Sequence, residues 1–428
     1  MQKNTPMNLS KKSLEYFLTH KVYGILIFLF LMWLMFFCTF NLGKYPKQGI
    51  EYLIKMFSHY VGTSVSHPVW SEFLSHGIID GVGSVLSFLP NIFIMFFFIA
   101  LYEMTGYSQR SALLMDKLMH GIGLHGVSFI PLLMGFGCNV PAILATKTVK
   151  RRSDRLVTML MIPFMSCSAR LPAYILLIGT FFPNNPLSML MILYISGIII
   201  AIITGFVINK LIFRPKPDFS EVYFCELRKP AFKSVFKFMW DASAEYIKKI
   251  GTVVLLAVIV VWLLDYFPRE KEDIRVENSV SNQLVLEKDT LIHLSYLSQV
   301  GHFISPVMKP LGFDWKMSVS LLAGLPAKEF IVGTMSVVYN TRHDSENNDI
   351  QARLKNETYE DGTVVFNKAV ALSFLFFTLL YMPCIGTLIS IWKEGNGLWA
   401  LFTFIYTTSL AWVAAFVVYR TALLFFAL

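Results

Sequence analysis

The chain has 428 residues, of which 55% are hydrophobic and only 15% are charged, and its mean hydropathy is +0.56. This composition excludes an ordinary soluble domain, because several uncharged apolar stretches are long enough to cross a bilayer. The net charge of +9 does not indicate nucleic-acid binding, since the basic residues flank apolar segments, as they do in the cytoplasmic loops of membrane proteins.

The first part of the chain is predicted to be a polar lead followed by membrane and interfacial helices. Residues 1–20 are polar and are expected to form a cytoplasmic lead, and the uncharged run Val22–Phe40 is the first predicted span. Residues 44–84 and 107–124 mix polar and apolar positions at helical spacing, which predicts helices lying at the membrane interface. Between them, Val85–Tyr102 is the second predicted span.

The stretch Phe129–Pro172 consists of two apolar runs, each broken from within. Glycine, proline and cysteine mark the breaks, at Gly135, Gly137, Cys138, Pro141, Pro163, Cys167 and Pro172. A helix broken inside hydrocarbon exposes backbone groups that lipid cannot satisfy, so such breaks are tolerated only where they line a cavity or are buried in protein. We therefore expect these two segments to form a site for a solute, and the cysteines favour a soft or borderline metal ion.

A basic stretch separates this region from the second part of the chain. Leu187–Ile208 is uncharged and is predicted to be a span. Residues 213–250 are predicted to be a basic cytoplasmic loop followed by an amphipathic helix, which leads into a span at Gly251–Leu264.

The remainder of the chain alternates polar insertions with apolar segments. Residues 268–296 and 340–366 are polar, and we expect them to be loops, the second of them flexible. Residues 316–339 form a glycine-containing apolar segment. Ala369–Trp392 and Leu398–Tyr419 are the last two predicted spans.

The second half of the chain weakly repeats the first. GFGCNVPAILATKTV and IPFMSCSARLP are followed much later by AGLPAKEFIVGTMSV and LYMPCIGTL. Corresponding Gly/Pro-interrupted segments in two halves point to the binding site of a transporter. We therefore predict an all-α, polytopic transmembrane fold with two membrane halves, 21–212 and 251–428, each carrying one broken-helix gate repeat. The charge distribution and the span count predict that the two repeats are inverted.

Three of the five cysteines are candidate metal ligands. Cys138, Cys167 and Cys384 each lie at a predicted break or beside a proline. A buried cysteine is more often a small apolar residue, but recurrence at breaks in both halves favours a ligand role for these three. Thiolates suit soft or borderline ions, whereas Mg²⁺ prefers oxygen. Cys38 and Cys225 lack this context and are expected to be inert.

Other side chains near the breaks could complete a metal site. Asn139 offers an amide oxygen, and Met134 offers a soft sulfur, although methionine is also a common filler of membrane cores. Glu329 is a carboxylate inside an apolar segment and is a functional candidate for that reason; the alternative places it near the interface, with Lys328 extending to water. Arg170 is expected to pair with an acid or a backbone carbonyl. No catalytic constellation is present, which argues against an enzyme.

These motifs resemble the membrane part of the ferrous iron transporter B family. The resemblance is carried by MGFGCNVPAILATKTV, RLVTMLMIPFMSCSARLPAY, GLPAKEFIVGT and LLYMPCIGT, and it covers nearly the whole chain. It implies a multi-pass protein of the bacterial inner membrane that imports Fe(II) along a path using the cysteines of these motifs, without a permanently bound cofactor.

Members of that family usually also carry an N-terminal guanine-nucleotide-binding domain. This sequence contains no GxxxxGK[ST] phosphate-binding motif. Either the nucleotide-binding part is a separate cytoplasmic GTPase that gates the path, or the chain is a split or membrane-only member of the family. The expected partners are Fe(II), the bilayer and such a GTPase, and association into a homo-oligomer is left open. A gate-type carrier of another divalent metal or of a nucleoside, and a non-transporting scaffold, are the alternative functions.

Overall fold

The computed structural model describes residues 21–64, 74, 79–87, 89–213, 231–248, 252–267, 295–339, 350–358, 362 and 364–426. Within these ranges the chain is built from α-helices and short helical turns, and the one bridge of β type joins Thr358 to Val364 in isolation. The predicted all-α class is confirmed. The predicted lead 1–20, most of the basic loop and most of the polar loop 268–296 lie outside the described residues.

Among the described residues, four helical segments are long and apolar enough to cross a membrane: Arg152–Phe181, Pro186–Phe213, Lys368–Glu394 and Gly397–Phe425. The last three of these segments contain the predicted spans Leu187–Ile208, Ala369–Trp392 and Leu398–Tyr419. Two apolar helices, Leu89–Met104 and Leu255–Leu264, lie where further spans are predicted, but each is shorter than the roughly 20 residues that a helix perpendicular to the bilayer requires.

The contacts of the chain divide it into two compact units. Unit 1 comprises residues Met1–Tyr60, Val82–Ile162 and Ile202–Gly251. Its helices, which lie wholly or mostly in these ranges, are α2 (Lys21–Phe37), α3 (Gly43–Ser64), α5 (Asp80–Ser87), α6 (Leu89–Met104), α7 (Tyr107–His120), α8 (Phe129–Met134), α9 (Asn139–Ala145), α10 (Arg152–Met161) and α13 (Phe232–Tyr246).

Unit 2 comprises Val61–Gly81, Pro163–Ala201 and Thr252–Leu428. Its helices are α11 (Leu171–Phe181), α14 (Thr252–Tyr266), α16 (Tyr296–Met308), α17 (Trp315–Ala323), α18 (Phe330–Val338), α19 (Ile350–Asn356), α20 (Lys368–Leu380), α21 (Ile385–Glu394) and α22 (Gly397–Phe426). One helix, α12 (Pro186–Ile208), begins in unit 2 and ends in unit 1. The predicted halves 21–212 and 251–428 are divisions of the sequence, and they do not coincide with these contact units.

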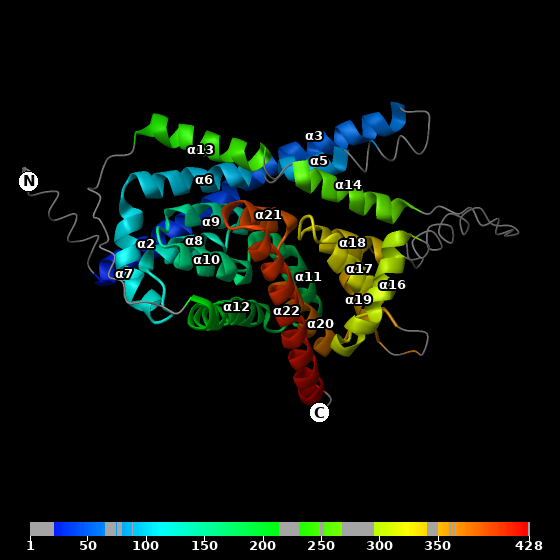
Figure 1. Ribbon diagram of the computed structural model, residues 1–428. Coiled ribbons are helices and arrows are strands. Elements are labelled where there is room, and N and C mark those ends of the chain that lie inside the picture. Colours follow the sequence, from blue (N-terminus) through cyan, green and yellow to red (C-terminus); the bar gives the residue numbers. More distant parts are fainter. Residues whose placement is uncertain are drawn as a thin grey trace, which may run out of the picture. The chain divides into compact units, whose positions relative to one another are not determined.

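In unit 1, α13 lies along α6 (Figure 1), and aromatic pairs such as Phe93–Trp240 join the two helices. A polar anchor connects α10 to the turn after α7. Asp154, only 1% exposed, accepts hydrogen bonds from the backbone N–H of His125 and pairs with the Nδ1 of the same residue at 2.5 Å. Because Asp154 lies in the first turn of α10, its carboxylate also faces the positive end of that helix.

In unit 2, the long helix α22 packs along α20 (Figure 1). Ser373 of α20 donates to the backbone carbonyls of Leu311 and Ala415, so one hydroxyl joins three segments in the core. Gly312 has φ +82°, which favours glycine, and a Cβ there would stand 2.6 Å from the Tyr419 ring. These contacts fix α20 against α22 and the turn at Leu311. They therefore also fix the position of the helix break that begins where α20 ends, at Leu380.

One expectation for the polar insertion 340–366 needs correction. The segment is not entirely a loop, because residues 350–356 form the helix α19, which packs on α11. Leu354 is fully buried, and Phe366 is 2% exposed and stacks on Phe181. Apolar side chains in a mainly polar stretch thus pack it against the neighbouring helices, and Glu357 adds an ion pair with Lys316 at 2.8 Å.

Candidate functional site

All three candidate cysteines lie at helix breaks, immediately before a helical segment. Cys138 precedes α9, Cys167 precedes the turn Ser168–Arg170 that leads into α11, and Cys384 precedes α21. Their predicted position at breaks is therefore confirmed, whereas their role as ligands stays a prediction.

The first break, in unit 1, separates α8 from α9. The backbone N–H groups of Gly137 and Cys138 both donate to the Met134 carbonyl, at 3.0 and 3.1 Å, so the chain closes α8 and starts a new helix at Asn139. Asn139 is 4% exposed, and its Oδ1 accepts no hydrogen bond in the described part of the chain. A buried acceptor without a donor costs about 1–3 kcal/mol, and a bound cation would satisfy it.

Met134 lies beside this break and is 3% exposed. It lines a cavity of about 140 Å³, whose walls include Met32, Met35 and Glu103. A Cβ added to Gly137 would stand 2.9 Å from the sulfur of Met95, so this glycine allows another thioether to approach the break closely. The thioethers of Met134 and Met95 therefore lie near the first break, in a mainly apolar environment, and a ligand role for Met134 stays a prediction.

The second and third breaks lie together in unit 2. Cys167 interacts electrostatically with Arg170, Cys384 and Glu329, so two cysteines, an acid and a cation from three segments of sequence are neighbours. The Cys384 sulfur is 3.2 Å from the Thr387 hydroxyl. Arg170, 1% exposed, donates to the Pro163 carbonyl at 3.2 Å, which confirms its predicted pairing with a backbone carbonyl. Its Nε is buried without a hydrogen-bond partner in the described residues.

The alternative in which Lys328 extends to water is wrong. Its side chain is 2% exposed, its Nζ donates to the Met382 carbonyl at 2.9 Å, and Nζ lies 3.4 Å from the centroid of the Tyr381 ring. Burial leaves the amino group of Lys328 no water to reach, so it donates to the carbonyl and lies against the aromatic ring instead. Glu329, immediately before α18, is only partly buried.

The break between α17 and α18 is also joined to the break between α20 and α21 through the backbone. Ile385 N–H, in the first turn of α21, donates to the Leu325 carbonyl at 3.1 Å. Together with the bond from Lys328 to Met382, this places the GLPAKEF and YMPCIGT motifs in contact. The sequence pattern identified both motifs, but their contact depends on tertiary structure.

The described residues contain no group of three or more His, Cys, Asp or Glu side chains close enough together to hold a metal ion. Each break thus offers an incomplete ligand set, of one or two cysteines with oxygen donors nearby. Incomplete coordination is compatible with an ion that must bind and then leave.

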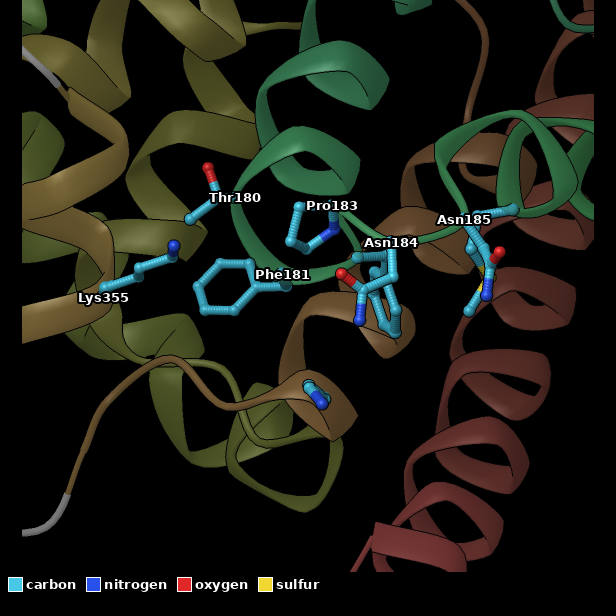
Figure 2. A pocket seen from close by; sticks show the side chains of 9 residues that line it. Thr180, Phe181, Pro183, Asn184, Asn185 and Lys355 are labelled. Atoms are coloured by element: carbon cyan, nitrogen blue, oxygen red, sulfur yellow. The ribbon is translucent and has the colours of Figure 1, made fainter.

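A separate cavity of about 410 Å³ lies in unit 2 where α11 turns into α12 (Figure 2). Its lining includes Phe181, Asn184, Lys355 and Lys368 and no acidic residue. Figure 2 shows Lys355 and Asn184 on either side of the Phe181 ring. Two lysines and no acid make this cavity unsuitable for a free cation, so it is not part of the candidate metal site.

Two features of the site are not evident from sequence reasoning. Neither the role of Tyr381 nor the burial of Lys328 is predicted from the sequence. A lysine within an apolar segment is as unusual as the neighbouring Glu329, and this could have marked Lys328 as a candidate. The pairing of His125 with Asp154 joins residues 29 positions apart, and no local pattern indicates it.

Comparison with known proteins gives consistent results. The family model described as Gate, nucleoside recognition, matches residues 85–181 and 247–397, more than half of the chain. The Fe(2+) transport protein A/Fe(2+) transporter FeoB fusion protein of Porphyromonas gingivalis is 42% identical over 96% of this chain and 52% of the relative. Fe(2+) transporter FeoB of Campylobacter jejuni is 39% identical over 97% of this chain and 66% of the relative. Fe(2+) transporter FeoB of Methanocaldococcus jannaschii is 34% identical over 98% of this chain and 60% of the relative.

The chain therefore spans about half to two-thirds of the length of these curated relatives. The search of solved structures found no match. The predicted resemblance to ferrous iron transporter B proteins is confirmed over almost the whole chain, and the match of the family model shows that the chain belongs to the Gate family.

Proposed function

We propose that this chain forms the membrane path of a ferrous iron transporter in the bacterial inner membrane. The observation that carries the proposal is that each of three helix breaks has a cysteine directly before the next helical segment. The names of the relatives, Fe(2+) transporter FeoB, support Fe(II) as the transported ion. Thiolates with a few oxygen donors suit this borderline ion better than Mg²⁺ or Ca²⁺.

In the proposed mechanism, hydrated Fe(II) exchanges water for protein ligands at the breaks. At the first break, Cys138 supplies sulfur and the unpaired Oδ1 of Asn139 supplies oxygen, with Met134 as a further soft donor. At the unit 2 breaks, Cys167 and Cys384 supply sulfur and Glu329 a carboxylate. Because each ligand set is incomplete, the ion is not trapped and can move on. Fe(II) is a substrate in this scheme and not a resident cofactor.

The proposal is tested by anaerobic uptake of radioactive iron into proteoliposomes. Cys138→Ser, Cys167→Ser and Cys384→Ser should each reduce uptake, because a hydroxyl is a poorer ligand for Fe(II) than a thiolate. Loss of a direct ligand should cost at least as much as loss of an outer-sphere contact, roughly 10–100-fold in affinity or activity.

Cys38→Ser is the matched control, because Cys38 lies in the helical turn Cys38–Leu42, outside the breaks. Its uptake should remain at the parental level. Parental uptake in all three break variants would contradict a cysteine-dependent path.

The description of the matched family as nucleoside recognition favours one second candidate, a carrier of nucleosides with the same architecture. A nucleoside has no need of thiolate ligands. Uptake of labelled nucleoside that survives the combined replacement of Cys138, Cys167 and Cys384, in a chain that takes up no iron, would favour this candidate over iron transport.

A further inference from the structure

The cavity of about 410 Å³ at the turn from α11 to α12 has a positively charged lining and no part in the proposed metal path (Figure 2). Its lining residues all belong to unit 2 and come from this turn with the adjoining helix ends, from α19 and from the start of α20. The charged residues among them are Lys355 and Lys368, and both are exposed, as lysines usually are. The volume lies within the roughly 300–1,000 Å³ typical of ligand sites.

Two helix ends add to the positive charge of the lysines. The 23-residue helix α12 begins at Pro186, directly after the lining residue Asn185, and the 13-residue helix α20 begins at Lys368 itself. The start of a helix carries partial positive charge, and a lysine at that position increases this charge instead of offsetting it. Asn184, which lies across the Phe181 ring from Lys355 (Figure 2), offers an amide donor. The lining therefore suits an anion.

The position of the cavity favours an anion that belongs to the membrane. Of the four membrane-length segments among the described residues, three have an end beside it. Arg152–Phe181 ends there, and Pro186–Phe213 and Lys368–Glu394 begin there. The ends of spanning helices lie at the level of the lipid headgroups. Basic pockets between membrane helices at this level bind the headgroups of anionic lipids.

The face of α12 that continues from the cavity is apolar and exposed. Asn185, in the lining, and Ile192 are two helical turns apart and so lie on the same face. Ile195 and Ile199 continue this face at helical spacing, and the three isoleucines are 49%, 53% and 50% exposed. A free phosphate would leave this face unused, whereas the acyl chains of a lipid held by its headgroup would cover it.

We propose that this cavity binds the phosphate of an anionic phospholipid, with Lys355 and Lys368 as its charged contacts and the acyl chains along the exposed face of α12. The bound headgroup joins the helix of the polar insertion, α19, and the start of α20 to the turn between α11 and α12. The proposal goes beyond the proposed transport function and does not depend on the identity of the transported ion.

Binding can be measured by native mass spectrometry of the full chain in a mild non-ionic detergent. The lipid probes are phosphatidylglycerol and a phosphatidylcholine with the same acyl chains. Both contain a phosphate, but the choline cation cancels the net negative charge. Inorganic phosphate, which has the charge without the chains, is added as a competitor. These three probes separate the contribution of the net charge from that of the chains.

The parent should bind phosphatidylglycerol more tightly than phosphatidylcholine, and inorganic phosphate should displace it only in large excess. Lys355→Gln and Lys368→Gln should each weaken the binding of phosphatidylglycerol about fivefold, the contribution of one lysine near an anionic lipid surface. Lys355→Arg and Lys368→Arg retain the charge and should bind as the parent does. Lys393→Gln, which removes an exposed lysine at the other end of the segment Lys368–Glu394, is the matched control and should have no effect.

Parental binding of phosphatidylglycerol in the double variant Lys355→Gln/Lys368→Gln would overturn the proposal, and so would equal affinity of the parent for the two lipids. Displacement of phosphatidylglycerol by a comparable concentration of inorganic phosphate would show that the cavity takes a free phosphate and not a lipid. Iron uptake, measured separately, tests the proposed transport function, so a failure of one proposal is distinguished from a failure of the other.

Discussion

We expect the buried side chain of Asp314 to make the stability of this protein depend on pH. It precedes α17, outside the membrane-spanning helices, and is 7% exposed. Its Oδ1 accepts hydrogen bonds from the Met317 backbone N–H at 2.7 Å and from the Tyr339 hydroxyl at 2.8 Å. Burial nevertheless outweighs these bonds and raises the pKa of Asp314 from 3.8 to about 6.

The direction of the pH effect follows from this shift. The folded state holds the proton of Asp314 more tightly than the unfolded chain, so the protonated form contributes stability that is fully present below about pH 4. That contribution is lost as the pH rises through about 6. A shift of about two pKa units corresponds to a free energy on the order of 3 kcal/mol.

Replacing the carboxyl group with an uncharged amide should remove this dependence. In Asp314→Asn the amide oxygen can still accept from Met317 N–H, so the start of α17 is preserved. The unfolding temperature of the parent in detergent should fall more between about pH 5 and about pH 7.5 than that of the variant. Asp241→Asn, at an exposed position on α13, is the control. Parallel curves for the parent and Asp314→Asn would contradict the assignment.

At the scale of the element, α12 depends on small residues spaced four positions apart. Gly197, Ala201 and Gly205 lie on one face of this helix, and Ala201 is fully buried. A Cβ on Gly197 would stand 2.8 Å from the Phe164 carbonyl oxygen, and a Cβ on Gly205 would stand 2.4 Å from the Met161 sulfur. Small residues at this spacing let a helix approach a neighbouring backbone closely, which is a common packing mode in membranes.

The two glycines allow a matched comparison. Gly197→Ala should lower the unfolding temperature, because a backbone carbonyl beside the second break cannot move without displacing that break; overpacking of this kind costs about 1–3 kcal/mol. Gly205→Ala meets only a flexible methionine side chain, and the better helix propensity of alanine, about 1 kcal/mol, offsets the contact. Thermal unfolding in detergent measures both variants. Equal effects would show that the Phe164 carbonyl does not limit the packing of α12.

At the scale of the whole molecule, the relatives are considerably longer than this chain. The chain covers 52% of the Porphyromonas gingivalis relative and 66% of the Campylobacter jejuni relative. The sequence lacks the glycine-rich loop with lysine that cradles nucleotide phosphates. We propose that a guanine-nucleotide-binding part outside this sequence controls the opening of the path, by contact with its basic loops.

This control can be examined on the complex as it occurs in native membranes. The complex purified under mild conditions should bind a photoreactive GTP analogue, and excess unlabelled GTP should abolish the labelling. The isolated chain, which has no phosphate-binding loop, is the matched control and should not be labelled. A native complex that binds no guanine nucleotide would contradict the proposal.

The amino-acid sequence by itself determined the fold class, the spans near residues 187, 369 and 398, and the position of Cys138, Cys167 and Cys384 at helix breaks. These features depend on local causes: apolar length sets a span, and glycine and proline interrupt the hydrogen bonds between residues four apart. The inversion of the two repeats stays a prediction, as do the ligand roles of the cysteines.

Only the tertiary structure decided where Lys328 lies, that Cys167, Cys384 and Glu329 are neighbours, and that the insertion 340–366 contains a helix packed on α11. The physical reason is that a buried polar group pairs with whatever partner the fold brings to it. For Lys328 that partner is 54 residues away, and neither hydropathy nor spacing in the sequence specifies a contact over that distance.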